Sequence, residues 1–167
     1  MTLTQTFAAH PIDPAVVAQL RVRDDAGRSP QTVVDAEGGS PLRCCLRASR
    51  PGEELLLASY APLRRWAAAR GVDPGPYDEV GPVFVHRLRC DGPDGDGWPD
   101  DLRGQPRVLR AYDGSGRIVG GTLLAPDDDP DPAIAEIFAD ERVALVHARA
   151  VEYGCFTFAI TAETARC

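Results

Sequence analysis

Lysine and asparagine are both absent from this 167-residue chain, and all 18 of its basic residues are arginine. The absence of lysine excludes Schiff-base chemistry, covalently held pyridoxal phosphate and the lysine of a phosphate loop. Anions must then be held by arginine, histidine or backbone N–H groups, and the planar arginine fork favours carboxylates. The strong preference for arginine is typical of a GC-rich bacterial genome.

Long apolar runs are also missing, since no stretch approaches the roughly 20 residues that span a bilayer. The N-terminus shows neither the basic nor the apolar region of a signal peptide. A net charge of −7 argues against a general binder of nucleic acid or anionic membranes. Five cysteines, an odd number without a secretion signal, indicate reduced thiols and a cytoplasmic protein.

Turn residues and apolar patterns predict one α+β domain over residues 1–167, with a mainly antiparallel sheet of about six to eight strands. Capping residues predict three short helices, at 14–20 after Asp13, at 62–70 before Gly71 and at 130–139 after Asp129. Residues 1–30 are expected to form only a helix and a loop. Strands are expected at 32–34, 42–48, 54–60, 82–90, 108–112, 117–124, 143–149 and 155–160, with a hairpin joining 42–48 to 54–60.

The segment 143–156 concentrates the side chains most capable of chemistry. Strand periodicity places His147 and Arg149 on one face, where the imidazole can transfer protons and the guanidinium can hold an anion. The alternative is a hydrogen-bonded core histidine beside an arginine at a strand end. Three registers remain open for Cys155: opposite Val151 if Gly154 is left-handed, opposite Arg149, or on the other face.

The predicted strand 42–48 places Cys44 inward and Cys45 outward. Buried cysteines are usually small hydrophobic residues, and a reactive thiol needs a nearby cation to lower its pKa. For Cys155, Arg149 or His147 could supply that charge.

His86 shares a strand face with Phe84 and is either a satisfied core histidine or part of a site. A metal site could combine histidines and cysteines from several strands. The spacing matches no known zinc finger or ribbon, so neither a metal nor an organic cofactor is expected. The set considered for such a site is His86, Cys90, His147 and Cys155.

Four segments, taken in order, resemble the small bacterial family called domain of unknown function 1203, over residues 40–162. They are Arg43-Cys44-Cys45-Leu46 with the Pro51-Gly52-Glu53 turn and Leu56 to Tyr60; Tyr77 to His86; Leu109 to Asp113; and Ile137 through His147-Ala148-Arg149 to Phe156. Two departures stand out. Ala150-Val151 replaces an expected Asn-Ala pair, and the helical segment around Trp66 resembles an insertion.

The resemblance implies a set of positions to test and no reaction. Those positions are Cys44, Tyr77, His86, Arg110, His147, Arg149 and Cys155.

These observations lead to the hypothesis of a small enzyme that acts on an anionic, carboxylate-bearing metabolite, with specialised metabolism as one setting for it. The expected chemistry is isomerisation, cyclisation or elimination. His147, Cys155, Tyr77 and His86 would be catalytic, and Arg149, Arg110 and Cys44 would bind substrate. Two alternatives remain: a non-catalytic module that binds a small ligand or a protein, and a metalloprotein with histidine and cysteine ligands. No nucleic-acid or membrane partner is expected, and the oligomeric state is left open.

Overall fold

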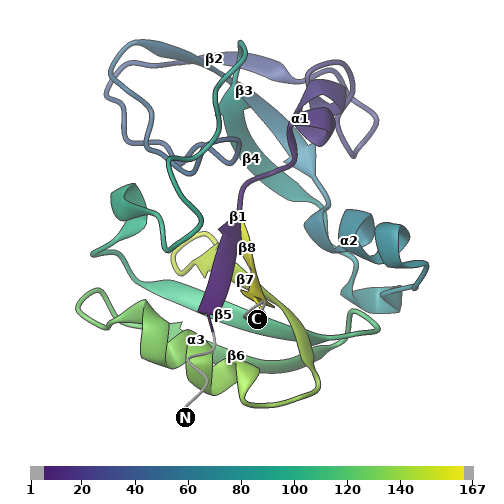
Figure 1. Cartoon of the computed structure of the whole chain (residues 1–167). Coiled ribbons are helices and arrows are strands. Elements are labelled where there is room, and N and C mark those ends of the chain that lie inside the picture. The colour runs from purple at the N-terminus through teal and green to yellow at the C-terminus, as the bar shows by residue number, and fades with distance from the viewer. Residues whose placement is uncertain (1–5, 164–167) are drawn as a thin grey trace.

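Two antiparallel sheets, one of five strands and one of three, form an α+β domain in the computed structural model, which describes residues 6–163 (Figure 1). The larger sheet has the order β1 (Thr6–His10), β8 (Phe156–Glu163), β7 (Val143–Ala150), β5 (Arg107–Asp113) and β6 (Ile118–Leu124). The smaller sheet has the order β2 (Gln31–Asp35), β3 (Glu53–Tyr60) and β4 (Gly81–His86). This confirms the predicted fold class.

Three short α-helices lie where the capping residues predict them: α1 (Pro14–Leu20), α2 (Pro62–Arg70) and α3 (Pro130–Phe138). The Asp13 side chain accepts a hydrogen bond from the backbone of Ala15, and Gly71 ends α2 in the left-handed conformation at φ 67°. These predictions are confirmed because capping is a local interaction, which depends on a few neighbouring residues. No helix within residues 6–163 is long and apolar enough to cross a membrane.

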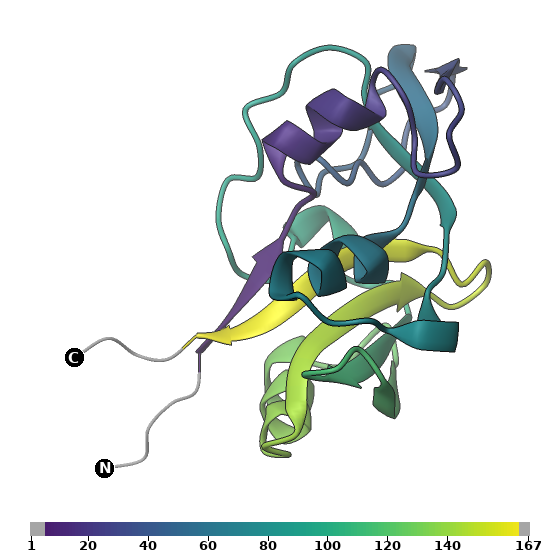
Figure 2. The ribbon, with the colours of Figure 1, turned by 90° about the vertical axis from the view of Figure 1, so that its right-hand side faces the viewer.

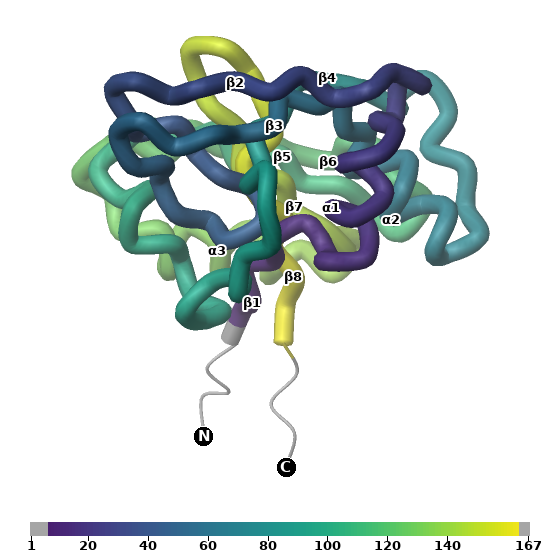
Figure 3. The backbone as a smooth tube through the Cα atoms, turned by 90° about the horizontal axis from the view of Figure 1, so that it is seen from above, coloured from purple at the N-terminus to yellow at the C-terminus, as the bar shows by residue number. Residues whose placement is uncertain are grey.

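Each sheet has its own apolar core. Helix α3 and the loop containing Trp98 cover the larger sheet, where the rings of Trp98 and Phe158 meet edge to face at 5.0 Å. Helix α1 covers the smaller sheet, which lies above the larger one and in front of it when seen from above (Figures 2 and 3). Tyr60 of β3 and Phe156 of β8 pack with ring centroids 5.5 Å apart and join the two cores.

The prediction of a strand at 42–48 is wrong. Both edges of β3 are occupied, by β2 and by β4, so residues 42–48 cannot form the predicted hairpin with it. They close a tight turn, in which the Leu46 N–H donates to the Leu42 carbonyl at 2.8 Å. Only isolated bridges remain, and one of these pairs Leu42 in parallel with Phe84. As a consequence Cys45, expected to point outward, is as buried as Cys44.

Two further boundaries differ from the prediction. Strand β4 ends at His86 instead of reaching Cys90, and the freed segment bends back towards the smaller sheet. The N-terminal strand β1 was not predicted; it forms an edge of the larger sheet by pairing with β8. A strand of five residues carries little periodic signal, and this one is specified by its partner strand.

Candidate functional site

Three thiols and one imidazole converge between α1, the turn at 42–47 and the end of β4. We call Cys44, Cys45, His86 and Cys90 the thiol cluster, because one ligand atom of each lies within 4.8 Å of all the others. The Nδ1 atom of His86 is 3.2 Å from the Cys44 sulfur and 3.7 Å from the Cys45 sulfur. Tetrahedral zinc bonds of ordinary length place sulfur and nitrogen ligands about 3.5 to 3.8 Å apart. The cluster is therefore close to a preformed four-ligand shell.

The tight turn at 42–47 explains how two consecutive cysteines can serve one site. Neighbouring side chains on a strand point to opposite faces. Here the chain turns instead, and Leu46 has φ 59°, the only positive φ of a non-glycine residue within residues 6–163. Such a conformation costs about 1 kcal/mol or more and often marks a functional site. The strained turn lies directly beside the thiol cluster.

Arg21, which follows α1, holds the segment that supplies Cys90. Its guanidinium donates hydrogen bonds to the backbone carbonyls of His86 at 3.3 Å and Leu88 at 2.7 Å. These bonds give the carbonyls partners after β4 has ended. The segment can then bend and bring Cys90 beside His86.

Glu53 fixes the orientation of the His86 ring. The Nε2 atom of His86 donates to a Glu53 carboxylate oxygen at 2.9 Å. A hydrogen bond from the backbone N–H of Arg50 and the nearby imidazole lower the pKa of Glu53, so this carboxylate is ionised. With Nε2 protonated, Nδ1 presents its lone pair to the three sulfurs. Histidines that bind metals are commonly held by a carboxylate in this way.

The two consecutive thiols differ in acidity. The hydrogen bond with Cys44, assisted by the backbone N–H of Arg47, lowers the pKa of Cys45 below that of an ordinary thiol. The same hydrogen bond, together with burial, raises the pKa of Cys44. The Cys44 sulfur also accepts the backbone N–H of His86 at 3.2 Å. The surroundings thus stabilise negative charge on the Cys45 sulfur and the protonated form of Cys44.

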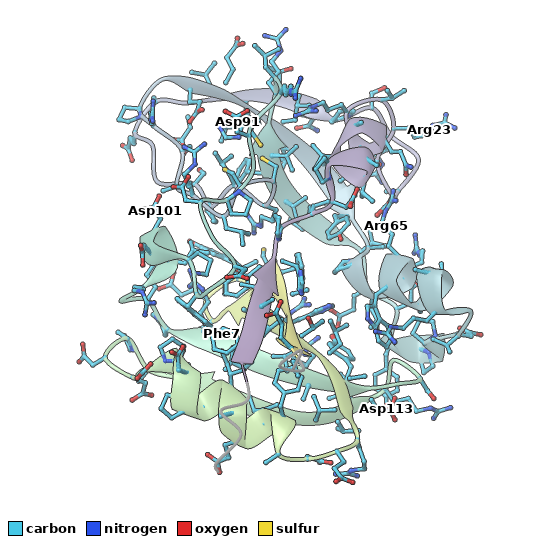
Figure 4. The ribbon with its side chains drawn as sticks, viewed as in Figure 1. Phe7, Arg23, Arg65, Asp91, Asp101 and Asp113 are labelled. Carbon is cyan, nitrogen blue, oxygen red and sulfur yellow. The ribbon has the colours of Figure 1, made fainter. Side chains whose placement is uncertain are left out.

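Two cavities reach the thiol cluster from different sides. One, of about 500 Å³, is lined by Cys44, Cys90 and Arg21, and the other, of about 420 Å³, by Cys45 and Arg47. In Figure 4 sulfur atoms gather beneath the labelled Asp91, next to the smaller sheet. An ion or a small molecule can approach from solvent, although Cys44 and Cys45 are themselves buried.

His147 lies in the larger sheet, apart from the thiol cluster. Its side chain is 1% exposed and is enclosed edge to face by the rings of Tyr112 and Phe156, at 4.8 and 4.9 Å. Its Nδ1 atom has no hydrogen-bond partner in the part of the chain that the structure describes. Burial, with the positive charges of Arg149 and Arg110, lowers the pKa of His147 to about 3. The imidazole is therefore neutral at neutral pH.

Arg110 and Arg149 both bind a carboxylate of the chain itself. One oxygen of Glu79 lies 3.0 Å from Arg110, and the other lies 2.9 Å from Arg149. Arg149 also donates to the carbonyl of Gly154 at 2.9 Å. The charge that was expected to hold a substrate is thus matched by Glu79, next to a small cavity of about 180 Å³.

Cys155 lies beside this arginine pair, and Tyr77 lies in another place. Gly154 is left-handed at φ 69°, as the register opposite Val151 requires. However, the backbone N–H of Ala150 donates to the backbone carbonyl of Cys155. Cys155 therefore lies opposite Ala150, which differs from the expected pairings with Val151 and with Arg149. Cys155 lines the small cavity beside Arg149, whereas Tyr77 packs against the apolar cluster around Tyr112. Of the predicted residues, the structure brings together Cys44 and His86 in one place, and Arg110, Arg149 and Cys155 in another.

Replacing Glu79 with glutamine is expected to lower stability only modestly. The Glu79 side chain is half exposed, so the loss should be about 1 kcal/mol or less, which is roughly 2–4 °C in Tm. Thermal unfolding at low and high salt measures this loss, which should shrink as salt screens the ion pairs. Glu141→Gln, at an exposed residue, is the control. An equal loss in both variants would contradict a specific role for Glu79.

The sequence reasoning missed Cys45, Cys90 and Glu53 as members of one site. One signal was present, the His-x₃-Cys spacing of His86 and Cys90, because paired zinc ligands are typically two to five residues apart. The set considered from sequence joined His86 and Cys90 to His147 and Cys155, which belong to the other sheet.

Comparisons with known proteins place this site within a family. Neither the curated proteins nor the solved structures contain a match. One family model, described as "Protein of unknown function (DUF1203)", matches residues 39–162, which is most of the chain and includes the whole thiol cluster. The chain therefore belongs to the DUF1203 family.

Proposed function

We propose that this protein binds a thiophilic divalent metal of the zinc class through Cys44, Cys45, Cys90 and His86. The observation that carries the proposal is the convergence of three sulfurs and one imidazole nitrogen within 4.8 Å. Thiolate and imidazole ligands favour zinc, whereas calcium and magnesium favour oxygen. The carboxylate of Glu53 behind the imidazole supports the same assignment.

The ligand set favours a structural role for the metal. Four protein ligands fill a tetrahedral shell, whereas catalytic zinc usually keeps one position open for water or substrate. Bound to residues of both, the ion would cross-link the turn at 42–47 to His86 at the end of β4 and to Cys90. Three thiolates around one Zn²⁺ leave a net charge of −1, and Arg21 and Arg89, which line the adjoining cavity, offset it.

The test is the metal content of the purified chain, followed by cobalt substitution. We expect about one zinc per chain by elemental analysis, and in the cobalt form a sulfur-to-cobalt charge-transfer band with the strong visible bands of tetrahedral Co²⁺. Cys90→Ser should weaken metal binding by 10-fold or more, on the order of what a lost ligand or supporting residue costs. Cys155→Ser is the matched control, because Cys155 lies outside the cluster. A chain that binds no metal, or variants that bind it equally, would refute the proposal.

A second function is favoured by one specific observation. A cysteine sulfur, the His86 ring and the Glu53 carboxylate form a chain of contacts, as in enzymes with an activated cysteine nucleophile. Cys45 borders the cavity of about 420 Å³. Such an enzyme would need Cys45, His86 and Glu53 and would not need Cys90.

Cys90→Ser therefore separates the two functions. Selective alkylation of Cys45 in the metal-free protein, located by peptide mass spectrometry and unchanged by Cys90→Ser, would favour the nucleophile. Loss of metal binding in the same variant favours the metal centre.

A further inference from the structure

Two buried arginines, Arg43 of the turn at 42–47 and Arg107 at the start of β5, have no carboxylate partner among the described residues. Arg43 is 4% exposed and Arg107 is 5% exposed, yet neither forms an ion pair within residues 6–163. Buried charges in proteins are nearly always paired. This pair lies in a chain whose net charge is −7, so carboxylates are plentiful elsewhere.

The hydrogen bonds of these arginines satisfy only part of each guanidinium. Arg43 donates to the carbonyls of Phe156 at 2.9 Å and Pro41 at 2.6 Å. Arg107 donates to the carbonyl of Pro106 and to the side chain of Gln105, both at 2.9 Å. The buried Nε of Arg107 has no partner among the described residues. Each guanidinium has five N–H donors, so several remain free for a ligand.

Burying these two positive charges without a carboxylate partner is unfavourable, because both guanidinium groups lose hydration. Arg43 and Arg107 are both buried and line the same cavity. Burial alone lowers the pKa of Arg107. Two like charges thus share a poorly solvated place, and a bound anion would offset both the desolvation and the repulsion.

Both arginines line a cavity of about 350 Å³ at the start of β5 and the end of β7. Ala150, Pro106 and Tyr153 supply apolar parts of its wall. A cavity of this size fits a small organic molecule. Glu152 stands at the exposed rim and forms no ion pair with either arginine.

We propose that this cavity binds a small organic carboxylate, with Arg43 and Arg107 holding the carboxylate group and the apolar wall holding its hydrocarbon part. The planar fork of arginine matches a carboxylate in two-point contact. Binding of an anion here goes beyond the proposed metal centre and shares no side chain with it. It also differs from the pair Arg110 and Arg149, whose charge Glu79 already matches.

The test is calorimetric titration of the metal-loaded protein with hexanoate and benzoate, with inorganic phosphate and chloride as competing classes of anion. We expect the carboxylates to bind and to raise the Tm. Arg107→Met should lose about tenfold or more in carboxylate affinity. It should also raise the Tm of the ligand-free protein, because it removes an unpaired buried charge. A purely structural arginine would give the opposite shift in Tm.

Arg103→Met is the matched control, since Arg103 is half exposed and paired with Asp100, and its carboxylate affinity should equal that of the wild type. Ala150→Phe keeps both arginines and fills the cavity, so it should also abolish binding and decides the matter if Arg107→Met does not fold. The proposal is overturned if neither carboxylate binds, if phosphate binds more tightly than both, or if the variants that fold bind them like the wild type. Every measurement uses metal-loaded protein, so a failure to bind carboxylate would leave the proposed metal centre standing.

Discussion

A strong chelator is expected to lower the Tm of the metal-loaded protein by about 10 °C or more. A ligand that binds only the folded state stabilises it by about 4 kcal/mol at 1,000 times its dissociation constant, and tightly held structural zinc contributes more. For a domain of this length, 1 kcal/mol corresponds to roughly 2–4 °C. The turn at 42–47 and the segment before Cys90 should loosen first, because the ion would join them. Differential scanning calorimetry with and without the chelator measures the effect.

The matched variants sharpen this expectation. Cys90→Ser should begin with a lower Tm and respond little to the chelator, whereas Cys155→Ser should respond like the wild type. Returning zinc to the chelated protein should restore the original Tm. A chelator response of the same size in Cys90→Ser would show that the stabilising ion binds elsewhere.

Acidification from about pH 6.5 to pH 3 is expected to destabilise the fold by on the order of 1 kcal/mol per pH unit through His147 alone. Its pKa is about 3 in the folded chain and near 6.5 in the unfolded chain. Between these values the unfolded state binds one more proton, so stability present at neutral pH is lost as the pH falls. Urea unfolding at a series of pH values gives the slope.

Two substitutions isolate this contribution. His147→Leu and His147→Phe differ in how they fill the space between Tyr112 and Phe156, so their stabilities at neutral pH should differ. Neither side chain titrates, so both variants should show the same shallower dependence on pH. A slope equal to that of the wild type in both would show that His147 is not the neutral, desolvated imidazole described above.

The helices could be predicted from sequence because their ends are specified locally. The side chains of Asp13 and Asp129 each accept a backbone N–H at the start of a helix, and Gly71 ends α2 in the left-handed conformation. The turn at 42–47 could not be predicted in this way. Its alternating residues resemble a strand, but β2 and β4 already occupy both edges of β3, where the predicted hairpin would pair.

The candidate site was predictable only in part, for a similar reason. Cys44 and His86 were singled out through the family resemblance, but their mutual distance depends on a strained Leu46 and on the bond from Arg21 to the end of β4. The arginines show the same limit. Arg149 was chosen for its strand position and Arg110 through the family resemblance. The sequence does not reveal that Glu79 reaches both, while Arg43 and Arg107 lack any such partner.

Because Arg43 and Cys44 are consecutive residues, the two proposed binding sites share one segment of the chain. The Arg43 side chain reaches β8 through the carbonyl of Phe156, and the next residue supplies a sulfur to the thiol cluster beside β4. Metal and carboxylate would then be bound by consecutive residues of one strained turn. Binding equilibria linked through a shared segment are reciprocal, so the factor by which zinc changes carboxylate affinity must equal the factor by which the carboxylate changes zinc affinity.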